Sequence, residues 1–491
     1  MVNADTYYVY MYGGVIKMKI IVLKEAGEKM SRAFSLFIVF ISLSFGGCTA
    51  HYPINDPITS INKEEGYRLG KTQHHVNRSE TLSVIMAFSG GGTRAAAYAY
   101  GVLEALRDIK ISWEGQERRL LDEVDTISSV SGGSFTAAYY GLFGERIFED
   151  FEEKFLYANV QGHLTSSFLN PFTWFKTGSL YFGRSDYAAE YYDEILFEGK
   201  TFGDMLERED APVIQINATE VSTSTQFTFL QEIFDLLCSD LSTFSVARAV
   251  AASSAVPVVF SSITINNRAG SCGFQMQPQA LAALDDPGPF SRRRHLIEKY
   301  IKYLDSENNP YLHLYDGGLT DNLGIRPGLN RLVIANDTWA FVKARGAGHM
   351  KRLVFIVINA QSESKTLYSR SASPVPFMDA ILGATSIPLN EYTFESLVTL
   401  SVVIKKFTEE IIKGRCADKE FNQGNSNDCA DFKAYLVYVD LDQVTDKEQR
   451  NRLKALPTSF VLQPEEVDEL REAARAVLMN NKNLKKFINE L

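Results

Sequence analysis

The sequence predicts an α/β protein in which a mostly parallel sheet is covered by helices on both faces, a three-layer α/β/α sandwich. One observation behind this prediction is that short apolar runs of strand length alternate along the chain with helical patterns. Another is that two of these runs lead through a glycine-containing turn into a helix of small residues. The composition, 45% hydrophobic and 22% charged over 491 residues, is that of a globular protein.

The first strand-turn-helix unit begins with the apolar run LSVIMAF at residues 82–88, which predicts a buried strand. The turn SGGGTR follows at residues 89–94. The next residues, 95–106, are rich in alanine and predict a helix that packs closely through its small side chains. Consecutive backbone N–H groups in such a turn, at a helix N-terminus, form an anion site without a cationic side chain.

The second unit repeats this order. Residues 124–130 predict a strand, residues 135–140 a helix, and the turn between them lies in SSVSGG at residues 128–133. A serine between a buried strand and a helix is typical of a nucleophile elbow, whose sharp turn projects the hydroxyl from the end of the sheet.

Further strands are predicted at residues 213–218, 311–315 and 353–359, and a helix at 246–255. The strand at 311–315 leads directly into DGGLTDN at residues 316–322. A lone Asp-Gly-Gly is usually a turn. Because the aspartate follows a strand, and because the same chain has two glycine-containing turns after strands, the aspartate is a candidate site residue.

Together the three segments SGGGTR, SSVSGG and DGGLTDN, in this order, resemble the patatin-like phospholipase family over roughly residues 81–359. The resemblance implies a patatin-like fold and a serine lipid acyl hydrolase that cleaves fatty-acyl esters through a Ser-Asp dyad and an acyl-enzyme intermediate. It implies a lipid or phospholipid substrate and neither a metal nor an organic cofactor. The chain carries no His-Glu-x-x-His and no Cys-x-x-Cys motif.

The resemblance assigns the site residues as follows. Ser131 is the nucleophile, and Asp316 is the base that takes its proton. The loop of Gly90, Gly91 and Gly92 supplies the oxyanion hole, with the individual donors left open.

Arg94 and Ser129 need separate interpretation. Arg94 follows the glycine loop, where it either fixes the loop, binds the anionic part of a phospholipid substrate, or is a solvated surface charge. Ser129 stands where the family pattern Gly-x-Ser-x-Gly has its first glycine, and a small residue fits beside this turn. Asp321 and Asn322 are expected to begin the next helix and to cap it.

A Ser-His-Asp triad is the alternative to a dyad, and in the α/β-hydrolase order only His349 follows Asp316. His349 precedes the strand at 353–359, whereas active sites of parallel sheets gather at the carboxyl ends of strands, so the dyad is favoured.

Two other function classes stay open. One is a catalytically silent envelope lipoprotein that binds lipid or protein. The other is a nucleotide-binding enzyme, because the loop of Gly90 to Gly92 also fits Gly-x-Gly-x-x-Ala. That motif needs an acidic residue at the end of the next strand, and residues 128–131 are SSVS. A net charge of −10 argues against nucleic acid as a partner.

Residues 1–47 are predicted to be a lipoprotein-type signal peptide, with a start at Met30 as an alternative. An apolar run at residues 34–43 follows the basic Arg32 and ends in Gly-Gly before Cys48. This arrangement resembles the lipobox of bacterial lipoproteins, which implies lipidation of Cys48, export and a lipid anchor in the cell envelope, with the outer membrane permitted. An uncleaved anchor helix is the alternative.

The domain boundaries follow from changes in composition. Residues 48–80 are polar and predict a tether, and residues 81–360 predict the patatin-like catalytic domain. Residues 361–491 predict a mainly helical extension packed on that domain, with a periodic segment at 390–413 and a closing helix that opens at Pro464.

Cysteine usage agrees with export. If Cys48 is lipidated, four cysteines remain, an even number that permits two disulfides. Cys416 and Cys429 bracket a short polar loop and predict one pair, which leaves Cys238 with Cys272 as the other. Four free buried thiols are the alternative.

Overall fold

The computed structural model describes residues 6–11, 14–19, 53–69, 78–170, 173–174, 181–362, 372–421 and 429–491. The chain divides into two units, Met1–His51 and Tyr52–Leu491. In the first unit, β1 (Thr6–Met11) and β2 (Gly14–Lys19) form an antiparallel hairpin. The apolar run at 34–43 and Cys48 lie outside the described residues, so the signal peptide and lipidation stay predictions.

The second unit is built on a sheet of eight strands. These are β4 (Leu82–Phe88), β7 (Val124–Val130), β8 (Val213–Glu220), β9 (Thr225–Thr228), β11 (Ile263–Asn266), β12 (Tyr311–Asp316), β13 (Arg352–Asn359) and β14 (Lys433–Asp440). The pairs β14–β13, β13–β4, β4–β7 and β7–β8 are all parallel. The pairs of β8 with β9 and β12, and of β12 with β11, are antiparallel. The predicted mostly parallel sheet is therefore confirmed, with antiparallel strands added at one side.

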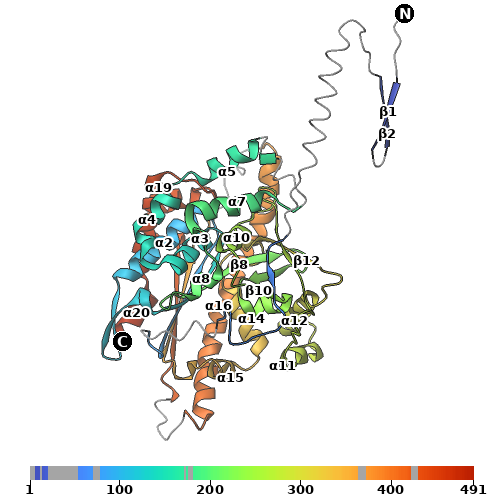
Figure 1. Ribbon diagram of the computed structural model, residues 1–491. Helices are drawn as coiled ribbons and strands as arrows, with labels where there is room; N and C mark the ends of the chain where they lie inside the picture. Colours follow the sequence, from blue (N-terminus) through green and yellow to red (C-terminus); the bar gives the residue numbers. More distant parts are fainter. Residues whose placement is uncertain are drawn as a thin grey trace, which may run out of the picture. The chain divides into compact units, whose positions relative to one another are not determined.

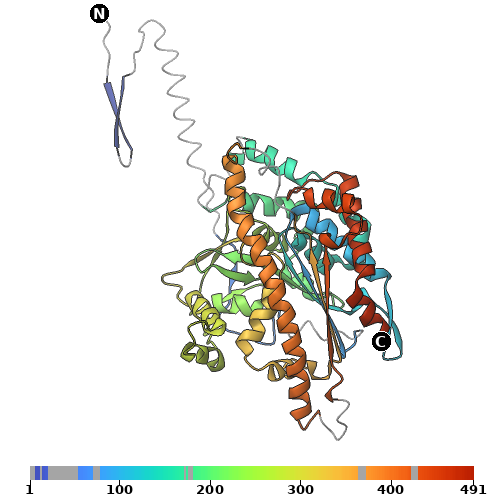
Figure 2. The same ribbon diagram turned by 180° about the vertical axis from the view of Figure 1, so that it is seen from behind.

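Helices cover both faces of this sheet (Figures 1 and 2). The first face carries α2 (Gly92–Asp108), α3 (Gly132–Phe143), α7 (Arg184–Tyr192), α10 (Val246–Ser253) and α19 (Pro464–Asn480). The second carries α14 (Arg326–Ala335), α15 (Thr338–Lys343) and α16 (Phe377–Ala417). The alternation of side chains along β4 separates the two cores, because Met86 packs in the first and Ala87 in the second. This three-layer arrangement confirms the predicted fold class.

The C-terminal extension is mainly helical and packs on the rest of the second unit. Its long helix α16 crosses the second face of the sheet, as Figure 2 shows. Its strand β14 extends the sheet beside β13, and α19 lies against α2 on the first face. Two further α-helices of this region are α18 (Lys447–Ala455) and α20 (Lys482–Asn489). No helix among the described residues combines the length and apolar content needed to cross a bilayer.

The described part of the predicted tether, residues 53–69, contacts the sheet-containing body. Asp56–Pro57 (β3) pairs with Ser239–Asp240 (β10), and the Tyr67 side chain is only 1% exposed. Arg68 forms an ion pair with Asp235 at 2.7 Å. The polar composition suggested a free linker, whereas a few buried side chains hold this segment in place.

Two disulfides join Cys238 with Cys272 and Cys416 with Cys429, the pairings considered from the sequence. The first holds the segment after α9 (Gln231–Phe234) to the loop after β11. The second closes the chain between the end of α16 and the start of β14.

The direction of β12 decides where its last residue lies. β7 runs parallel to β8 and pairs with residues 213–217, whereas β12 runs antiparallel to β8 and pairs with residues 218–220. The two strands therefore approach from opposite directions, and their C-terminal ends meet beside the middle of β8. This topology brings together two turns that are far apart in the sequence.

Candidate active site

Ser131 forms a sharp turn between β7 and α3. Its backbone has φ 50° and ψ −121°, a conformation that non-glycine residues rarely adopt and that costs about 1–3 kcal/mol. The next residue has to be glycine, because a Cβ on Gly132 would lie 2.0 Å from the carbonyl oxygen of Gly92. The turn therefore has the geometry of a nucleophile elbow and lies in contact with the glycine loop.

The Ser131 hydroxyl donates a hydrogen bond to Asp316. The distance from Ser131 Oγ to Asp316 Oδ2 is 2.8 Å, and both residues are buried. The other carboxylate oxygen, Oδ1, accepts from the N–H of Gly318 at 2.8 Å. The Asp316 carbonyl in turn accepts from the Thr219 hydroxyl at 2.9 Å, so both the side chain and the backbone of Asp316 are held.

Burial raises the pKa of Asp316 from 3.8 to about 6, while the hydrogen bonds from Gly318 and Ser131 oppose this rise. A carboxylate with this pKa is a stronger base than an exposed aspartate and is still ionised at neutral pH. The pair can therefore move a proton from the serine to the carboxylate as the serine attacks an electrophile.

The glycine loop joins β4 to α2 beside the elbow. The Gly90 N–H donates to the carbonyl of Asn322 at 2.9 Å, which excludes Gly90 from the predicted oxyanion donors. Gly92 has φ +62°, and a Cβ there would lie 2.3 Å from the Ser459 carbonyl oxygen. In the part of the chain that the structure describes, the N–H groups of Gly91 and Gly92 have no hydrogen-bond acceptor.

Gly132 offers a third donor that the sequence analysis did not assign. Its N–H begins α3 and has no acceptor among the described residues, and Gly92 begins α2 on the adjoining loop. Two helix N-termini therefore meet beside Ser131, and the positive ends of their dipoles favour a negative charge there. The elbow pattern could have revealed this donor, since the residue after the nucleophile usually contributes one.

Arg94 does not face the space in front of Ser131, so the prediction that it binds substrate is wrong. Its guanidinium is 2% exposed and donates to the carbonyls of Ala360 and Leu456 and to the Thr458 hydroxyl. Each of its three nitrogens donates one of these bonds, and together they hold the chain after β13 and the segment before α19. The alternative that Arg94 fixes the neighbourhood of the glycine loop agrees with these contacts.

A network of buried serine hydroxyls holds the backbone of the Ser131 turn in place. The Ser131 N–H donates to Ser253 Oγ at 2.9 Å, and Ser253 Oγ donates to the Asn217 carbonyl at 2.6 Å. The Ser253 carbonyl also accepts from the N–H of Gly317 at 3.1 Å. Ser253, the last residue of α10, thus links the Ser131 turn to the Asp316 turn, a role that nothing in the local sequence indicates.

Ser129, which replaces the expected glycine, belongs to the same network. It is fully buried, and its hydroxyl accepts from Ser134 Oγ at 3.1 Å, which lies 3.0 Å from Ser253 Oγ. The hydroxyl is therefore accommodated in the space behind the elbow rather than in front of it.

Asp321 and Asn322 lie at a different place in the local structure from the predicted helix start. They end α13 (Gly318–Asp321) rather than begin a helix. The Asp321 carboxylate nevertheless accepts from the N–H of Arg326 at 2.6 Å, at the first residue of α14, and so serves as a cap.

No histidine among the described residues hydrogen-bonds to Ser131 or Asp316. His349 lies at the entry to β13, at the opposite end of that strand from Asn359, and its ring packs on Phe421. The arrangement is a serine-carboxylate pair without a histidine between the two groups.

Comparisons with known proteins assign a family to part of the chain. Residues 86–329 match the family model of patatin-like phospholipases. No curated protein matches the chain in sequence. Among solved structures, the chain is similar to human GIVD cytosolic phospholipase A2, with 14% identity, TM-score 0.35, and coverage of 60% of this chain and 50% of that one. The chain thus spans about half of that protein.

A second similar structure is VipD from Legionella pneumophila, with 14% identity and a TM-score of 0.28. The alignment covers 89% of this chain and 73% of VipD. A third is a chain of the SpcU–ExoU complex from Pseudomonas aeruginosa, with 13% identity, TM-score 0.20, and coverage of 90% and 99%.

Proposed function

Residues 86–329 belong to the patatin-like phospholipase family, and from that premise we propose that the chain is a serine lipid acyl hydrolase that cleaves fatty-acyl esters. One observation carries the proposal. Ser131 has a strained backbone conformation, and its hydroxyl donates to the buried carboxylate of Asp316 at 2.8 Å. Beside it lie backbone N–H groups that lack acceptors among the described residues. A nucleophile, a base and donors for an oxyanion are the three requirements of acyl transfer.

The reaction proceeds in two displacement steps. Ser131 Oγ attacks the ester carbonyl while its proton moves to Asp316, and the negative charge on the carbonyl oxygen is stabilised by N–H groups of Gly91, Gly92 and Gly132. The alcohol leaves with the proton from Asp316, and the acyl group stays on Ser131. Water then attacks the acyl-enzyme, gives a proton to Asp316, and the fatty acid leaves as the proton returns to Ser131.

The pH dependence follows from the base. Because only ionised Asp316 accepts the proton and burial raises its pKa to about 6, we expect kcat/KM to fall roughly tenfold per pH unit below this value. Above it, kcat/KM reaches a plateau. Initial rates with an uncharged short-chain ester between pH 4.5 and 8.5 measure the profile. A rate that stays constant through pH 5 would contradict the role of Asp316.

Ser253→Ala is expected to lower kcat about 10- to 100-fold and to leave KM nearly unchanged. The substitution removes the acceptor of the Ser131 N–H and a donor to the Asn217 carbonyl, so the hydroxyl contact that holds the elbow is lost. The matched control is Ser254→Ala, since the Ser254 hydroxyl donates to the Val250 carbonyl of its own helix. Steady-state kinetics well below the unfolding temperature of each variant distinguish misplacement of Ser131 from unfolding. Equal kcat in both variants would remove Ser253 from the positioning network.

The proposed activity is tested with defined lipids. Purified protein is incubated with phospholipids and neutral esters that carry known acyl chains, and released fatty acid is measured by mass spectrometry. Release above the rate of a heat-inactivated sample supports a hydrolase. Binding of lipid vesicles without release of fatty acid or alcohol over the whole panel would instead support the catalytically silent alternative.

We further propose that Cys48 carries a lipid anchor that holds the hydrolase in the cell envelope, on the basis of the sequence pattern at residues 34–48. Mass spectrometry of the N-terminal peptide of the mature protein tests this. A chain that retains residues 1–47 with an unmodified Cys48 would exclude the anchor.

A further inference from the structure

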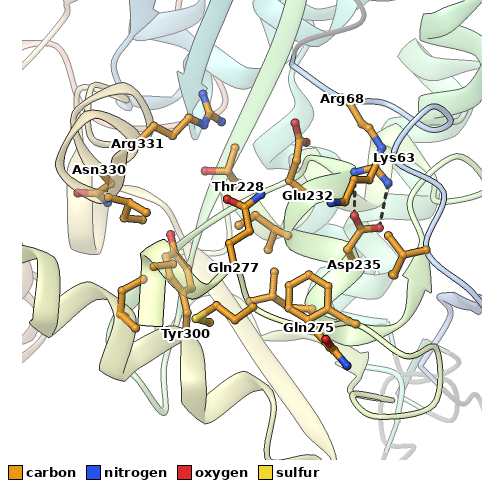
Figure 3. Close-up of a pocket in the computed structure, with 18 of the residues that line it drawn as sticks. Lys63, Arg68, Thr228, Glu232, Asp235, Gln275, Gln277, Tyr300, Asn330 and Arg331 are labelled. Carbon is orange, nitrogen blue, oxygen red and sulfur yellow. Dashed lines mark hydrogen bonds and ion pairs between the residues drawn. The ribbon is translucent and has the colours of Figure 1, made fainter. Parts of the chain in front are cut away.

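A cavity of about 930 Å³ lies away from the candidate active site, and none of its lining residues belongs to the Ser131 turn, the Asp316 turn or the glycine loop. Its walls come from α9, α14, α12 (Arg292–Tyr303) and the loop that contains Phe274. Figure 3 shows Arg331, Tyr300, Gln277 and Glu232 reaching toward one common space. The volume lies within the range of small-molecule sites.

Two arginines of this cavity lack acceptors among the described residues. Neither Arg331 nor Arg345 forms a hydrogen bond or an ion pair through its side chain there, and Arg345 Nε is buried. Burial lowers the pKa of both guanidinium groups, which reflects their removal from water. A neighbouring pair behaves differently, since Arg68 is satisfied by Asp235 at 2.7 Å (Figure 3). Arg345 lies 3.7 Å over the Phe341 ring, and the charge of Glu232 favours the ionised form of both arginines. Neither guanidinium has a hydrogen-bond acceptor among the described residues, and an anionic ligand would supply one.

The remaining charges leave the cavity positive. Arg68 and Asp235 neutralise each other, so Arg331, Arg345 and the exposed Lys63 face a single carboxylate, Glu232. One oxygen of Glu232 accepts from the Leu69 N–H at 3.1 Å. The Tyr300 hydroxyl and the Gln277 amide add neutral polar groups beside Arg331 (Figure 3).

Gln226, Thr228, Gln275 and Asn330 add further polar side chains, and the other large part of the lining is apolar. It is provided by Ile233, Leu236, Phe274, Met276, Ile297 and Ile334. An inorganic anion would leave most of this surface in contact with water, whereas an alkyl chain would cover it and gain about 25 cal/mol per Å² of apolar area buried.

We propose that this cavity is a second, non-catalytic site that binds an anionic amphiphile, with a carboxylate or phosphate head on Arg331 and Arg345 and an alkyl chain along the apolar wall. The head is held by charge-assisted hydrogen bonds, which for arginine are commonly bidentate. Binding needs no reaction at Ser131, so a result that contradicts this proposal leaves the proposed hydrolase activity unaffected, and the reverse is also true.

Calorimetric titration of the full chain with dodecyl phosphate, laurate and dodecyltrimethylammonium, each below its micelle concentration, tests the site. We expect one of the two anionic amphiphiles, or both, to bind, and the cationic one to bind at least about tenfold more weakly. The tighter of the two anions identifies phosphate or carboxylate as the head group. Failure of both anions to bind, or equal affinity for the cationic amphiphile, would overturn the proposal without any need for a variant.

A double variant, Arg331→Gln with Arg345→Gln, places the binding in this cavity. It is expected to lower the affinity for the anionic amphiphile at least about tenfold, whereas Arg292→Gln, an exposed position on α12, leaves it unchanged. Thermal unfolding of each variant is measured in parallel. Unchanged affinity in the folded double variant would assign the binding to another part of the protein and overturn the proposed site.

Discussion

Ser131→Ala is expected to lower ester turnover by at least about 1,000-fold and to leave the protein folded. The substitution removes the atom that forms the acyl-enzyme, while the N–H groups of Gly91, Gly92 and Gly132 stay in place and retain some stabilisation of the oxyanion. The backbone turn does not depend on the hydroxyl, because Ser131 is held through its N–H by Ser253. The measurement is kcat/KM for a short-chain ester together with the thermal unfolding midpoint.

The control for this variant is Ser166→Ala, an exposed serine on α5 (Val160–Leu169) whose hydroxyl donates to the His163 carbonyl of its own helix. It is expected to keep the full rate. Comparable turnover in Ser131→Ala and the unchanged chain would remove Ser131 from the reaction, and any hydrolysis would then have to arise elsewhere on the molecule.

Asp316→Asn is expected to lower kcat by about 1,000-fold or more and, at pH 8, to make the protein more stable. The amide cannot take the proton from Ser131, but its oxygen can still accept from the Gly318 N–H as Oδ1 does now. The stability gain arises because burial disfavours the charged carboxylate of Asp316, whose pKa is raised from 3.8 to about 6.

The size of this stability effect depends on pH. Between about pH 4 and pH 6 the folded state holds a proton on Asp316 that the unfolded state has lost, so the free energy of unfolding falls as the pH rises. Above this interval the loss amounts to at most about 3 kcal/mol. The variant has no such proton, so its advantage should be present at pH 8 and vanish below pH 4. Denaturant unfolding at both pH values measures it, and a variant that is less stable at pH 8 would contradict a carboxylate whose charged form is destabilised by burial.

The local parts of the fold could be predicted from the sequence because short-range patterns determine them. The strand before the glycine loop, residues 82–88, and the strand before the elbow, residues 124–130, have the bounds that their apolar runs predict. The glycine at 132 could be interpreted as a close approach of backbone, and its contact with Gly92 shows which backbone approaches.

The pairing of Ser131 with Asp316 could be predicted only from the resemblance to the family, because 185 residues separate the two in the sequence. Their meeting depends on β12 running antiparallel to β8, and strand direction leaves no local mark in an apolar run. Arg94 also depends on contacts that are distant in the sequence. Its charge suggested an anionic ligand as one interpretation, but its hydrogen-bond acceptors come from residues 360, 456 and 458. Ser253 was missed because a serine at the end of an alanine-rich helix carries no distinguishing pattern.

The most direct measurement is to label the protein with a fluorophosphonate probe and to locate the adduct by tandem mass spectrometry. A phosphonylated serine requires a nucleophilic hydroxyl next to donors that stabilise the negative oxygen of the adduct. We predict a single adduct on Ser131, formed much more slowly in Asp316→Asn. Hydrolysis of lipid by a chain whose adduct lies on another serine, or that forms no adduct, would contradict the proposed mechanism.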